Sequence, residues 1–358
     1  MQQRILTVIG ARPQFIKASV VSRAIQKTEG IEEIMLHTGQ HFDANMSDIF
    51  FNQLGIPKPD VQLDINGGSH GEMTGRMLAE IEQALLEHKP DRVLVYGDTN
   101  STLAGALAAA KLHIPVAHVE AGLRSFNMQM PEEINRILTD QVSDMLFCPT
   151  ATAVDNLHKE GFKAKPVQVL QVGDVMQDAA LLFAERAAAP VGAELPEQFI
   201  LATLHRAENT DDPKRLSSIV TALNHIHKTL APVVLPLHPR TRKLIAQHGL
   251  DLNVNLIDPV GYFEMVWLLD RAQLVLTDSG GVQKEAFFFR KACVIMRDQT
   301  EWRELIDIGA NELVGADKTR IVEAAARHFG RKVVDSEQLY GGGQASQRIV
   351  SKLVSTGA

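Results

Sequence analysis

The sequence predicts an α/β protein built from two domains, each with a parallel sheet. Short β-branched runs alternate with longer helical patterns along the whole chain, which is the signature of repeated βα units. With 358 residues, of which 45% are hydrophobic, the chain is long enough for two separate cores. Polar or small residues follow the strands in both halves. Because ligands of open α/β sheets bind at the carboxyl ends of the strands, we expect these turns to line a cleft.

The two halves of the chain have the same predicted plan. In the first half the expected strands are residues 5–9, 33–37, 92–96, 116–120 and 145–149. In the second half they are 199–203, 232–236, 254–256, 274–278 and 293–296, with helices at 213–230 and 262–272. We therefore expect two Rossmann-like domains, residues 1–170 and residues 171–340. Residues 341–358 follow a glycine-rich hinge and are expected to form a terminal helix that packs back on the first domain.

Composition excludes several classes of function. The net charge is -7 with both signs interspersed, so a broad nucleic-acid footprint is not expected. No apolar run approaches the length of a membrane span, and no signal-peptide pattern is present, which indicates a cytoplasmic protein. Cys148 and Cys293 form no CxxC pair, and the thirteen histidines include no HExxH motif. We expect neither a disulfide nor a metal site.

The run from Leu276 to Glu285 has the form of a phosphate-binding turn. An apolar strand ends in Ser279, Gly280 and Gly281 and then opens a helix. Glycines let the backbone approach an anion, and the first-turn N–H groups and the helix dipole favour negative charge. Glu285, within that helix, is placed to reach a ribose hydroxyl. An ordinary helix N-cap with tight packing is the structural alternative.

A second cationic turn follows the first strand. Arg12 stands at a helix start, with Pro13 beside it, and Lys17 follows about one turn later. The planar guanidinium suits a diphosphate, and the ammonium adds a second point charge. A solvated basic helix start is the alternative.

Three carboxylates end or follow strands of the first domain: Asp98, Glu120 and Glu132. Acids at strand ends that face a cleft are candidates for proton transfer. Each also has a structural alternative: Asp98 as the N-cap of the next helix, and Glu132 as a first-turn acid paired with Arg136. That all three are structural is less expected, because such acids cluster at functional sites.

Two histidines of the second domain follow apolar strands, where the cleft is expected. His205 follows residues 199–203, and His238 follows residues 232–236. A histidine in this position can donate to a phosphate oxygen or titrate near neutral pH. The alternative for each is a hydrogen-bonded loop histidine.

Seven motifs, in this order, carry a family resemblance over nearly the whole chain. They are Gly10-Ala11-Arg12-Pro13-Gln14-Phe15-Ile16-Lys17, Thr38-Gly39-Gln40-His41, Gly97-Asp98-Thr99, His118-Val119-Glu120-Ala121-Gly122-Leu123-Arg124, Pro131-Glu132-Glu133-Ile134-Asn135-Arg136, His205-Arg206-Ala207-Glu208-Asn209 and Thr277-Asp278-Ser279-Gly280-Gly281-Val282-Gln283-Lys284-Glu285. The chain resembles the non-hydrolysing UDP-N-acetylglucosamine 2-epimerase family. This resemblance implies a GT-B-like arrangement with the active site in the interdomain cleft, a C-terminal helix that crosses back, a homodimer and no cofactor.

The resemblance also implies roles for the candidate residues. The first domain would carry the acid/base residues, and the second would bind UDP. The residues expected to be catalytic are Asp98, Glu120, Glu132 and His205, and those expected to bind substrate are Arg12, Lys17, Arg136, His238, Ser279, Gly280, Gly281 and Glu285. Of these, Arg12, His205, Ser279 and Gly280 would hold the diphosphate, and Glu285 the ribose.

The chemistry of C2 inversion is consistent with these residue types. The C2 hydrogen of a pyranose is not next to a carbonyl, and the chain has no dinucleotide GxGxxG fingerprint for transient oxidation. Elimination of UDP avoids both problems. A carboxylate removes the C2 proton as UDP leaves C1, cations and the helix N-terminus hold the departing charge, and UDP re-adds while an acid protonates C2 from the opposite face.

Departures from the family pattern bear on the substrate. Gln14 and Phe15 replace a usual Glu-Ala, Trp302 and Arg303 replace a usual Arg-Pro, and Gly67-Gly68-Ser69-His70-Gly71 replaces an Arg-Gln pair that contributes to an allosteric site in many members. These variants resemble the branch that epimerises UDP-2,3-diacetamido-2,3-dideoxy-D-glucuronate in bacterial lipopolysaccharide O-antigen synthesis. The alternatives are UDP-N-acetylglucosamine as substrate, a GT-B glycosyltransferase, and a nucleotide-sugar sensor without turnover.

Overall fold

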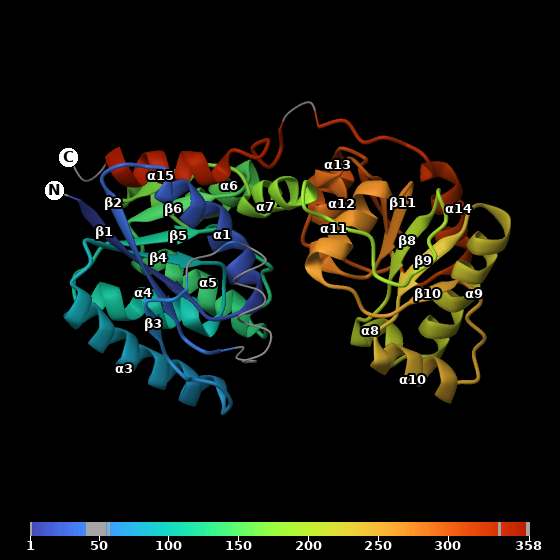
Figure 1. Ribbon diagram of the computed structural model, residues 1–358, viewed down its shortest axis with the longest axis horizontal. Helices are drawn as coiled ribbons and strands as arrows, with labels where there is room; N and C mark the ends of the chain where they lie inside the picture. The colour runs from blue at the N-terminus through green and yellow to red at the C-terminus, as the bar shows by residue number, and fades with distance from the viewer. Residues whose placement is uncertain (1, 41–54, 56–57, 336–337, 356–358) are drawn as a thin grey trace. The chain divides into compact units, whose positions relative to one another are not determined.

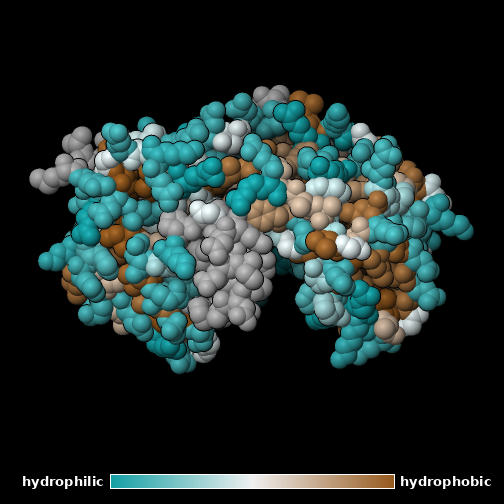
Figure 2. Space-filling model, in the orientation of Figure 1, coloured by the Kyte–Doolittle hydropathy of each residue, from teal (hydrophilic) through white to brown (hydrophobic). Residues whose placement is uncertain are grey.

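The computed structural model describes residues 2–40, 55, 58–335 and 338–355, which form two compact units (Figure 1). Unit 1 comprises Met1–Ala179 together with Gln338–Ala358, and unit 2 comprises Ala180–Glu337. Each contains one parallel sheet, and helices connect most of its successive strands, which confirms the predicted α/β class. Hydrophilic side chains cover most of the face seen in Figure 2. Among the described residues, no helix combines the length and hydropathy that a membrane span requires.

The sheet of unit 1 has seven strands in the order β3-β2-β1-β4-β5-β6-β7. Its strands are β1 (Gln3–Ile9), β2 (Ile31–His37), β3 (Val61–Gln62), β4 (Arg92–Tyr96), β5 (Val116–Val119), β6 (Met145–Cys148) and β7 (Gln168–Gln171). Its helices are α1 (Arg12–Gln26), α3 (His70–His88), α4 (Asn100–Lys111), α5 (Pro131–Val142), α6 (Ala151–Lys159), α7 (Val175–Ala184), whose last turn belongs to unit 2, and α15 (Ala345–Ser355), with a 3₁₀ turn η1 (Phe162–Ala164).

The strand order of unit 1 reverses between β1 and β4, which pair in parallel with Val8 opposite Val95. Successive connections run outward in opposite directions from this pair, so the loops after β1 and β4 diverge and leave a crevice at the carboxyl ends. The central strands read as nearly continuous apolar runs because helices cover both faces of the sheet (Figure 1). The fold thus places Gly10 and Gly97 side by side at the switch point.

Unit 2 repeats this construction with a sheet in the order β10-β9-β8-β11-β12-β13. Its strands are β8 (Ile200–Thr203), β9 (Val233–Pro236), β10 (Asn255–Ile257), β11 (Leu274–Thr277), β12 (Cys293–Ile295) and β13 (Asn311–Leu313). Its helices are α8 (Ala207–Thr210), α9 (Pro213–Thr229), α10 (Pro239–Gln247), α11 (Tyr262–Arg271), α12 (Gly280–Phe288), α13 (Arg303–Asp307) and α14 (Lys318–His328). Here the order reverses between β8 and β11, which brings the turns at His205 and Ser279 together.

The C-terminal segment belongs to unit 1, where α15 packs on α1. Asp178 in α7 accepts hydrogen bonds from the backbone N–H groups of Ala345 and Ser346, at 3.1 and 2.8 Å, and from the Ser346 hydroxyl at 2.6 Å. A carboxylate at the start of α15 satisfies N–H groups that have no intrahelical acceptor. Upstream, Gly173 has φ +99° and lies so close to Tyr340 that a Cβ would stand 2.6 Å from its carbonyl oxygen.

The structure differs from the sequence-based expectation at several boundaries. The predicted division at residues 170 and 171 falls inside β7, a strand of the unit 1 sheet, and that unit continues to Ala179. Helix α7 follows β7 and spans Val175–Ala184, so its first turn still belongs to unit 1. Strands β3, β7 and β13 were not expected. Runs of two and three residues, as in β3 and β13, carry no measurable alternation of apolar and polar positions.

Replacing Glu33 on β2 by glutamine is expected to stabilise unit 1 more at pH 8 than at pH 4. Burial raises the pKa of the Glu33 carboxyl, and the charge of Asp60 adds to this, against hydrogen bonds from Thr7 and Ser22. The pKa of Glu33 is thus higher in the folded chain than in the unfolded chain. Its contribution to the free energy of unfolding is therefore complete below the unfolded pKa of about 4.3 and is lost as pH rises through the folded pKa. Glutamine keeps an acceptor for the Thr7 hydroxyl, 2.6 Å away, and carries no charge.

Amide hydrogen exchange of β1 and β2 measures this effect at the two pH values. The matched control is Glu32→Gln, because Glu32 is the exposed neighbour on the same strand. Equal gains in protection at pH 4 and pH 8 for Glu33→Gln would contradict the expectation.

Candidate active site

The turn after β4 presents Asp98 at the switch point of unit 1. Gly97 adopts φ +65°, a left-handed conformation that glycine tolerates without strain. The N-cap of α4 is Thr99, whose hydroxyl accepts from Thr102 N at 3.3 Å. The alternative in which Asp98 caps this helix is therefore wrong. Its carboxylate instead forms an ion pair with Arg136 of α5.

Arg136 bridges two carboxylates, Asp98 and Glu133, at the N-terminal end of α5. Glu133 is buried and accepts backbone hydrogen bonds from Ser125 at 3.0 Å and Phe126 at 2.8 Å. Burial alone would raise the pKa of Glu133, but these N–H groups and the Arg136 charge outweigh it, so the pKa lies below its usual value. Glu133 thereby holds the loop that precedes α5 and orients the guanidinium of Arg136.

Glu132, the candidate acid in this helix, is exposed at the first turn of α5. The expected helix-spaced pair between Glu132 and Arg136 is replaced by the Glu133–Arg136 pair, 2.7 Å apart. Two consecutive glutamates at a helix start point in different directions, and the sequence contains no signal that says which one faces inward. The side chain of Glu132 therefore remains in solvent, while Glu133 binds Arg136 and the backbone of Ser125 and Phe126.

Glu120 lies directly after β5 and forms an ion pair with Lys17 of α1. The side chains of Lys17 and Glu120 are 13% and 11% exposed, so this pair is largely removed from water. Glu120 has φ +74°, a strained conformation for a residue with a side chain. A Cβ at Gly97 would stand 3.2 Å from the Lys17 ammonium and 3.4 Å from the Glu120 carboxylate. The Gly97 turn, Lys17 and Glu120 thus converge on one place.

Gln14 ties the start of α1 to the end of β4. Its buried carboxamide oxygen accepts from Gly10 N at 2.8 Å and Ala11 N at 2.9 Å, and its nitrogen donates to Tyr96 O at 2.9 Å. A glutamate here could accept the first two bonds but could not donate the third, which accounts for the amide in this chain. Arg12 begins the same helix, but its side chain, like residue His41, lies outside the described part of the chain.

In unit 2, a buried carboxylate shapes the turn that carries His205. Asp278, at the end of β11, accepts backbone hydrogen bonds from His205 at 3.1 Å and Arg206 at 3.0 Å, and one from the Asn209 amide at 3.3 Å. The ring of His205 is 48% exposed, with Nδ1 3.5 Å from Asp278 Oδ1. The two strand ends at the switch point are thereby fastened together, and the imidazole faces solvent.

Helix α12 begins directly after Asp278, with Ser279 as its N-cap. The Ser279 hydroxyl makes no capping bond within its own helix, so the simple N-cap alternative does not describe it. The Gly280 carbonyl accepts from the Trp302 indole N–H at 2.8 Å, and a Cβ on Gly280 would stand 3.0 Å from Glu301 Oε1. Gly281 is exposed. Gly280 is buried, so Gly281 is the exposed glycine at the start of this nine-residue helix, whose N-terminus has the form of an anion-binding site.

Two arginines near this helix start were not singled out from the sequence. Arg297 is buried and pairs with Glu301 at 2.9 Å and Glu208 at 3.2 Å, which fixes the loop after β12. Arg206 is exposed, and its guanidinium lies 3.7 Å from where a Gly280 Cβ would stand. The sequence signal for Arg206 is its place directly after His205, at the same strand end.

The remaining candidates lie at the edges of this cluster. His238 is the exposed N-cap of α10, where its Nδ1 accepts from Arg240 N at 3.3 Å, as the loop-histidine alternative predicts. Glu285 is half-buried on α12. Within the described ranges, no three His, Cys, Asp or Glu side chains gather in a group that could hold a metal ion.

A family model described as UDP-N-acetylglucosamine 2-epimerase matches residues 23–354 of the chain. The chain is 70% identical over 350 residues to a Pseudomonas aeruginosa protein named UDP-2,3-diacetamido-2,3-dideoxy-D-glucuronate 2-epimerase, and the match covers 98% of this chain and 99% of the relative.

Solved structures agree with this sequence match. UDP-GlcNAc 2-epimerase from Methanocaldococcus jannaschii, in complex with UDP-GlcNAc and UDP, has a TM-score of 0.82 at 42% identity over 99% of this chain and 100% of that one. The Neisseria meningitidis enzyme bound to UDP-GlcNAc has a TM-score of 0.84 at 32% identity, again over 99% and 100%. Both similarities extend over the whole of this fold.

Proposed function

Because this chain belongs to the UDP-N-acetylglucosamine 2-epimerase family, we propose that it inverts C2 of UDP-2,3-diacetamido-2,3-dideoxy-D-glucuronate to give the manno epimer. The observation that carries this choice of substrate is the 70% identity, over nearly the full length, to the Pseudomonas aeruginosa protein of that name. The replacement of the usual Arg-Pro by Trp302 and Arg303 supports a branch with its own sugar specificity, since Trp302 contacts the first residue of α12.

In this proposal, unit 2 holds the nucleotide. The N-terminus of α12, at Ser279, Gly280 and Gly281, binds the diphosphate together with His205, and Glu285 binds the ribose. Arg206 adds a guanidinium next to Gly280. These groups stabilise the charge that develops on the diphosphate as the C1–O bond breaks, which is where a preorganised helix N-terminus contributes most. Arg12 and His238 complete the proposed set of binding residues.

Unit 1 supplies the proton transfers. We assign the base and the acid to two of Asp98, Glu120 and Glu132, acting on opposite faces of the sugar. As one carboxylate takes the C2 proton, the C2–H electrons form the C1–C2 double bond and UDP leaves as an anion; re-addition reverses these steps while the second group protonates C2. Lys17 pairs with Glu120 and Arg136 pairs with Asp98, and these contacts orient the two acids.

UDP-N-acetylglucosamine is the second candidate substrate. The Methanocaldococcus jannaschii and Neisseria meningitidis structures of this fold are named as complexes with that sugar nucleotide. The two substrates differ in the group at C6, a carboxylate in one and a hydroxymethyl in the other, and in the substituent at C3. A site that pairs with the carboxylate rejects the analogue that lacks it, because the cation would remain unpaired.

Incubation with each UDP-sugar in deuterated water tests the proposed reaction and its substrate. We expect deuterium at C2 of both epimers of the diacetamido glucuronate, without any acceptor, and at least a 100-fold lower rate with UDP-N-acetylglucosamine. A glycosyltransferase would need an acceptor, and a sensor would bind without exchange. Epimerisation without deuterium incorporation would contradict proton transfer through solvent-exchangeable acids.

We also propose that the enzyme is a cytoplasmic homodimer in lipopolysaccharide O-antigen biosynthesis. The family resemblance supports the dimer, and the sugar named for the Pseudomonas aeruginosa relative supports the pathway. An exposed apolar row on α5, formed by Met130, Ile134 and Leu138, is compatible with a contact to a second chain. Light scattering at micromolar concentration measures the oligomeric state.

A further inference from the structure

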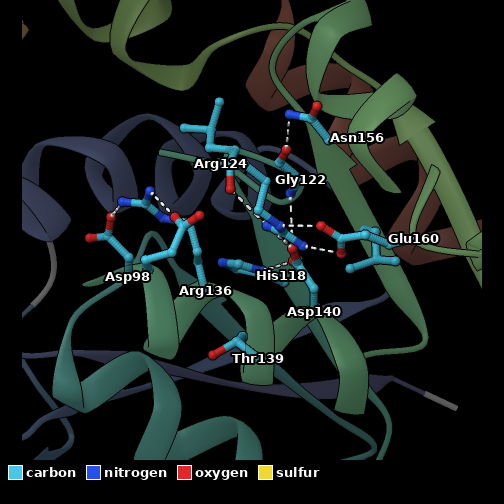
Figure 3. A network of polar contacts seen from close by, with 12 residues as sticks. Asp98, His118, Gly122, Arg124, Arg136, Thr139, Asp140, Asn156 and Glu160 are labelled. Carbon is cyan, nitrogen blue, oxygen red and sulfur yellow. Dashed lines mark hydrogen bonds and ion pairs between the residues drawn. The ribbon is translucent and has the colours of Figure 1, made fainter. Parts of the chain in front are cut away.

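His118 lies inside unit 1, on β5, and Figure 3 shows its ring beside Asp140. The turns that carry Asp98 and Glu120 follow β4 and β5, which pair with each other. The side chain of His118 is completely buried. It belongs neither to the ion pairs of the candidate acids nor to the apolar core. A buried ionisable side chain in this position needs partners that account for both ring nitrogens.

Both ring nitrogens of His118 face hydrogen-bond acceptors. Nε2 lies 2.7 Å from the carbonyl oxygen of Gly97, which can only accept, so Nε2 carries a hydrogen. Nδ1 lies 2.7 Å from Oδ1 of Asp140. The other oxygen of Asp140 accepts from Gly122 N at 3.1 Å and lies 2.8 Å from the guanidinium of Arg124. The His118 ring is therefore held through both of its nitrogens.

Arg124 and Glu160 extend this group. The Arg124 side chain is buried and makes a two-bond contact with Glu160, at 2.7 and 2.8 Å. Hydrogen bonds and ion pairs thus join His118, Asp140, Arg124 and Glu160 (Figure 3). Buried polar side chains persist where they are hydrogen-bonded, and each buried member here has at least one such partner.

This network connects both acid-bearing turns. The His118 ring holds the carbonyl of Gly97, the residue before Asp98. Through Asp140 it also holds the N–H of Gly122, two residues after Glu120. Gly97 and Gly122 adopt left-handed φ values of +65° and +78° without strain, whereas the +74° of Glu120 is strained and persists only where the surroundings fix it. One histidine thus links the two turns that present the two carboxylates.

We propose that His118 is a positioning residue that fixes the relative placement of Asp98 and Glu120. The inference rests on the proposed epimerase function, in which these acids work on the same C2 atom. It requires both ring nitrogens, because a side chain that bonds to only one turn leaves the other free to move. Misplacement of a reacting group by about 1 Å costs on the order of 100-fold in rate.

The variants His118→Asn and His118→Gln test this role, because an amide can donate to one acceptor but turns an oxygen towards the other. We expect kcat and C2 deuterium exchange to fall about 100-fold in parallel, with KM and the dissociation constant for UDP within about twofold. The control is His158→Asn on α6, a half-buried histidine in the same unit. An unchanged kcat in both His118 variants overturns the proposal, as does a loss confined to KM.

Nitrogen-15 NMR of the histidine rings tests these hydrogen bonds in the intact enzyme, even if the variants fold poorly. We expect the Nε2 hydrogen of His118 to exchange slowly with solvent, because it is buried and donates to the Gly97 carbonyl. Rapid exchange of this hydrogen overturns the inference. If the wild-type enzyme exchanges no deuterium at C2, the proposed function fails and the positioning role fails with it. If the wild type exchanges and the variants do so equally fast, only the role of His118 fails.

Discussion

Replacing Glu120 by glutamine is expected to lower kcat by roughly 10²–10⁴-fold while leaving UDP affinity nearly unchanged. Glu120 is nine-tenths buried, is paired with Lys17 and has a strained backbone, which together mark a carboxylate held for chemistry. Glutamine preserves the shape of the side chain but can neither accept the C2 proton nor return it. UDP binding is assigned to unit 2 and does not depend on this charge.

Steady-state kinetics and isothermal titration with UDP separate the two effects. The matched control is Glu87→Gln on α3, an exposed glutamate of the same unit, for which kcat should stay within about twofold. Asp98→Asn should resemble Glu120→Gln, because Asp98 stands at the neighbouring strand end with Arg136 as its cation. Full turnover in both variants would remove the carboxylates from the mechanism.

Strands whose ends are set by local chemistry could be predicted from the sequence almost to the residue. Residues 92–96 form β4 as expected, and 116–120 differ from β5 only at Glu120, where the backbone turns left-handed. Boundaries set by tertiary contact could not. Unit 1 continues through β7 into α7, where Asp178 accepts from the first residues of the terminal helix. Asp178 and Ser346 are 168 positions apart, so no local pattern indicates this contact.

The same distinction applies to the candidate site. Asp98 and Glu120 could be found because both follow apolar strands of a parallel sheet. The sequence does not indicate that Glu133, and not Glu132, pairs with Arg136. Both are first-turn glutamates, and only their contacts with the backbone of residues 125–126 distinguish them. His118 was part of a recognised motif, yet its role depends on Asp140, which is supplied by the following helix.

Two residues that depart from the family pattern turn out to support the backbone at the two switch points. Gln14 binds the loop after β1 to the end of β4, and Trp302 donates its indole N–H to Gly280 at the start of α12. Lys284 lies 4.3 Å above the Trp302 ring, a cation–π contact that joins the helix to the same loop. Both departures therefore replace a side-chain charge by hydrogen bonds to the backbone of a candidate binding turn.

Replacing Asp140 by asparagine is expected to destabilise unit 1 by about 3–5 kcal/mol, the largest stability effect among these changes. Asp140 is completely buried and accepts from His118, Gly122 and Arg124. Asparagine removes the anion that pairs with the buried Arg124 guanidinium and turns an N–H₂ donor towards a donor.

The positions of the two tryptophans allow this loss of stability to be assigned to one unit. Both tryptophans, Trp267 and Trp302, lie in unit 2, so fluorescence follows that unit while hydrogen exchange of β4 to β6 follows unit 1. We expect Asp140→Asn to reduce protection in unit 1 with little change in the fluorescence midpoint in urea. The control is Asp211→Asn, whose pair with Arg240 is half exposed and is worth at most about 1 kcal/mol. Equal losses in the free energy of unfolding for the two substitutions would contradict this expectation. Burial of the His118–Asp140–Arg124 group would then add nothing to the cost of losing a carboxylate.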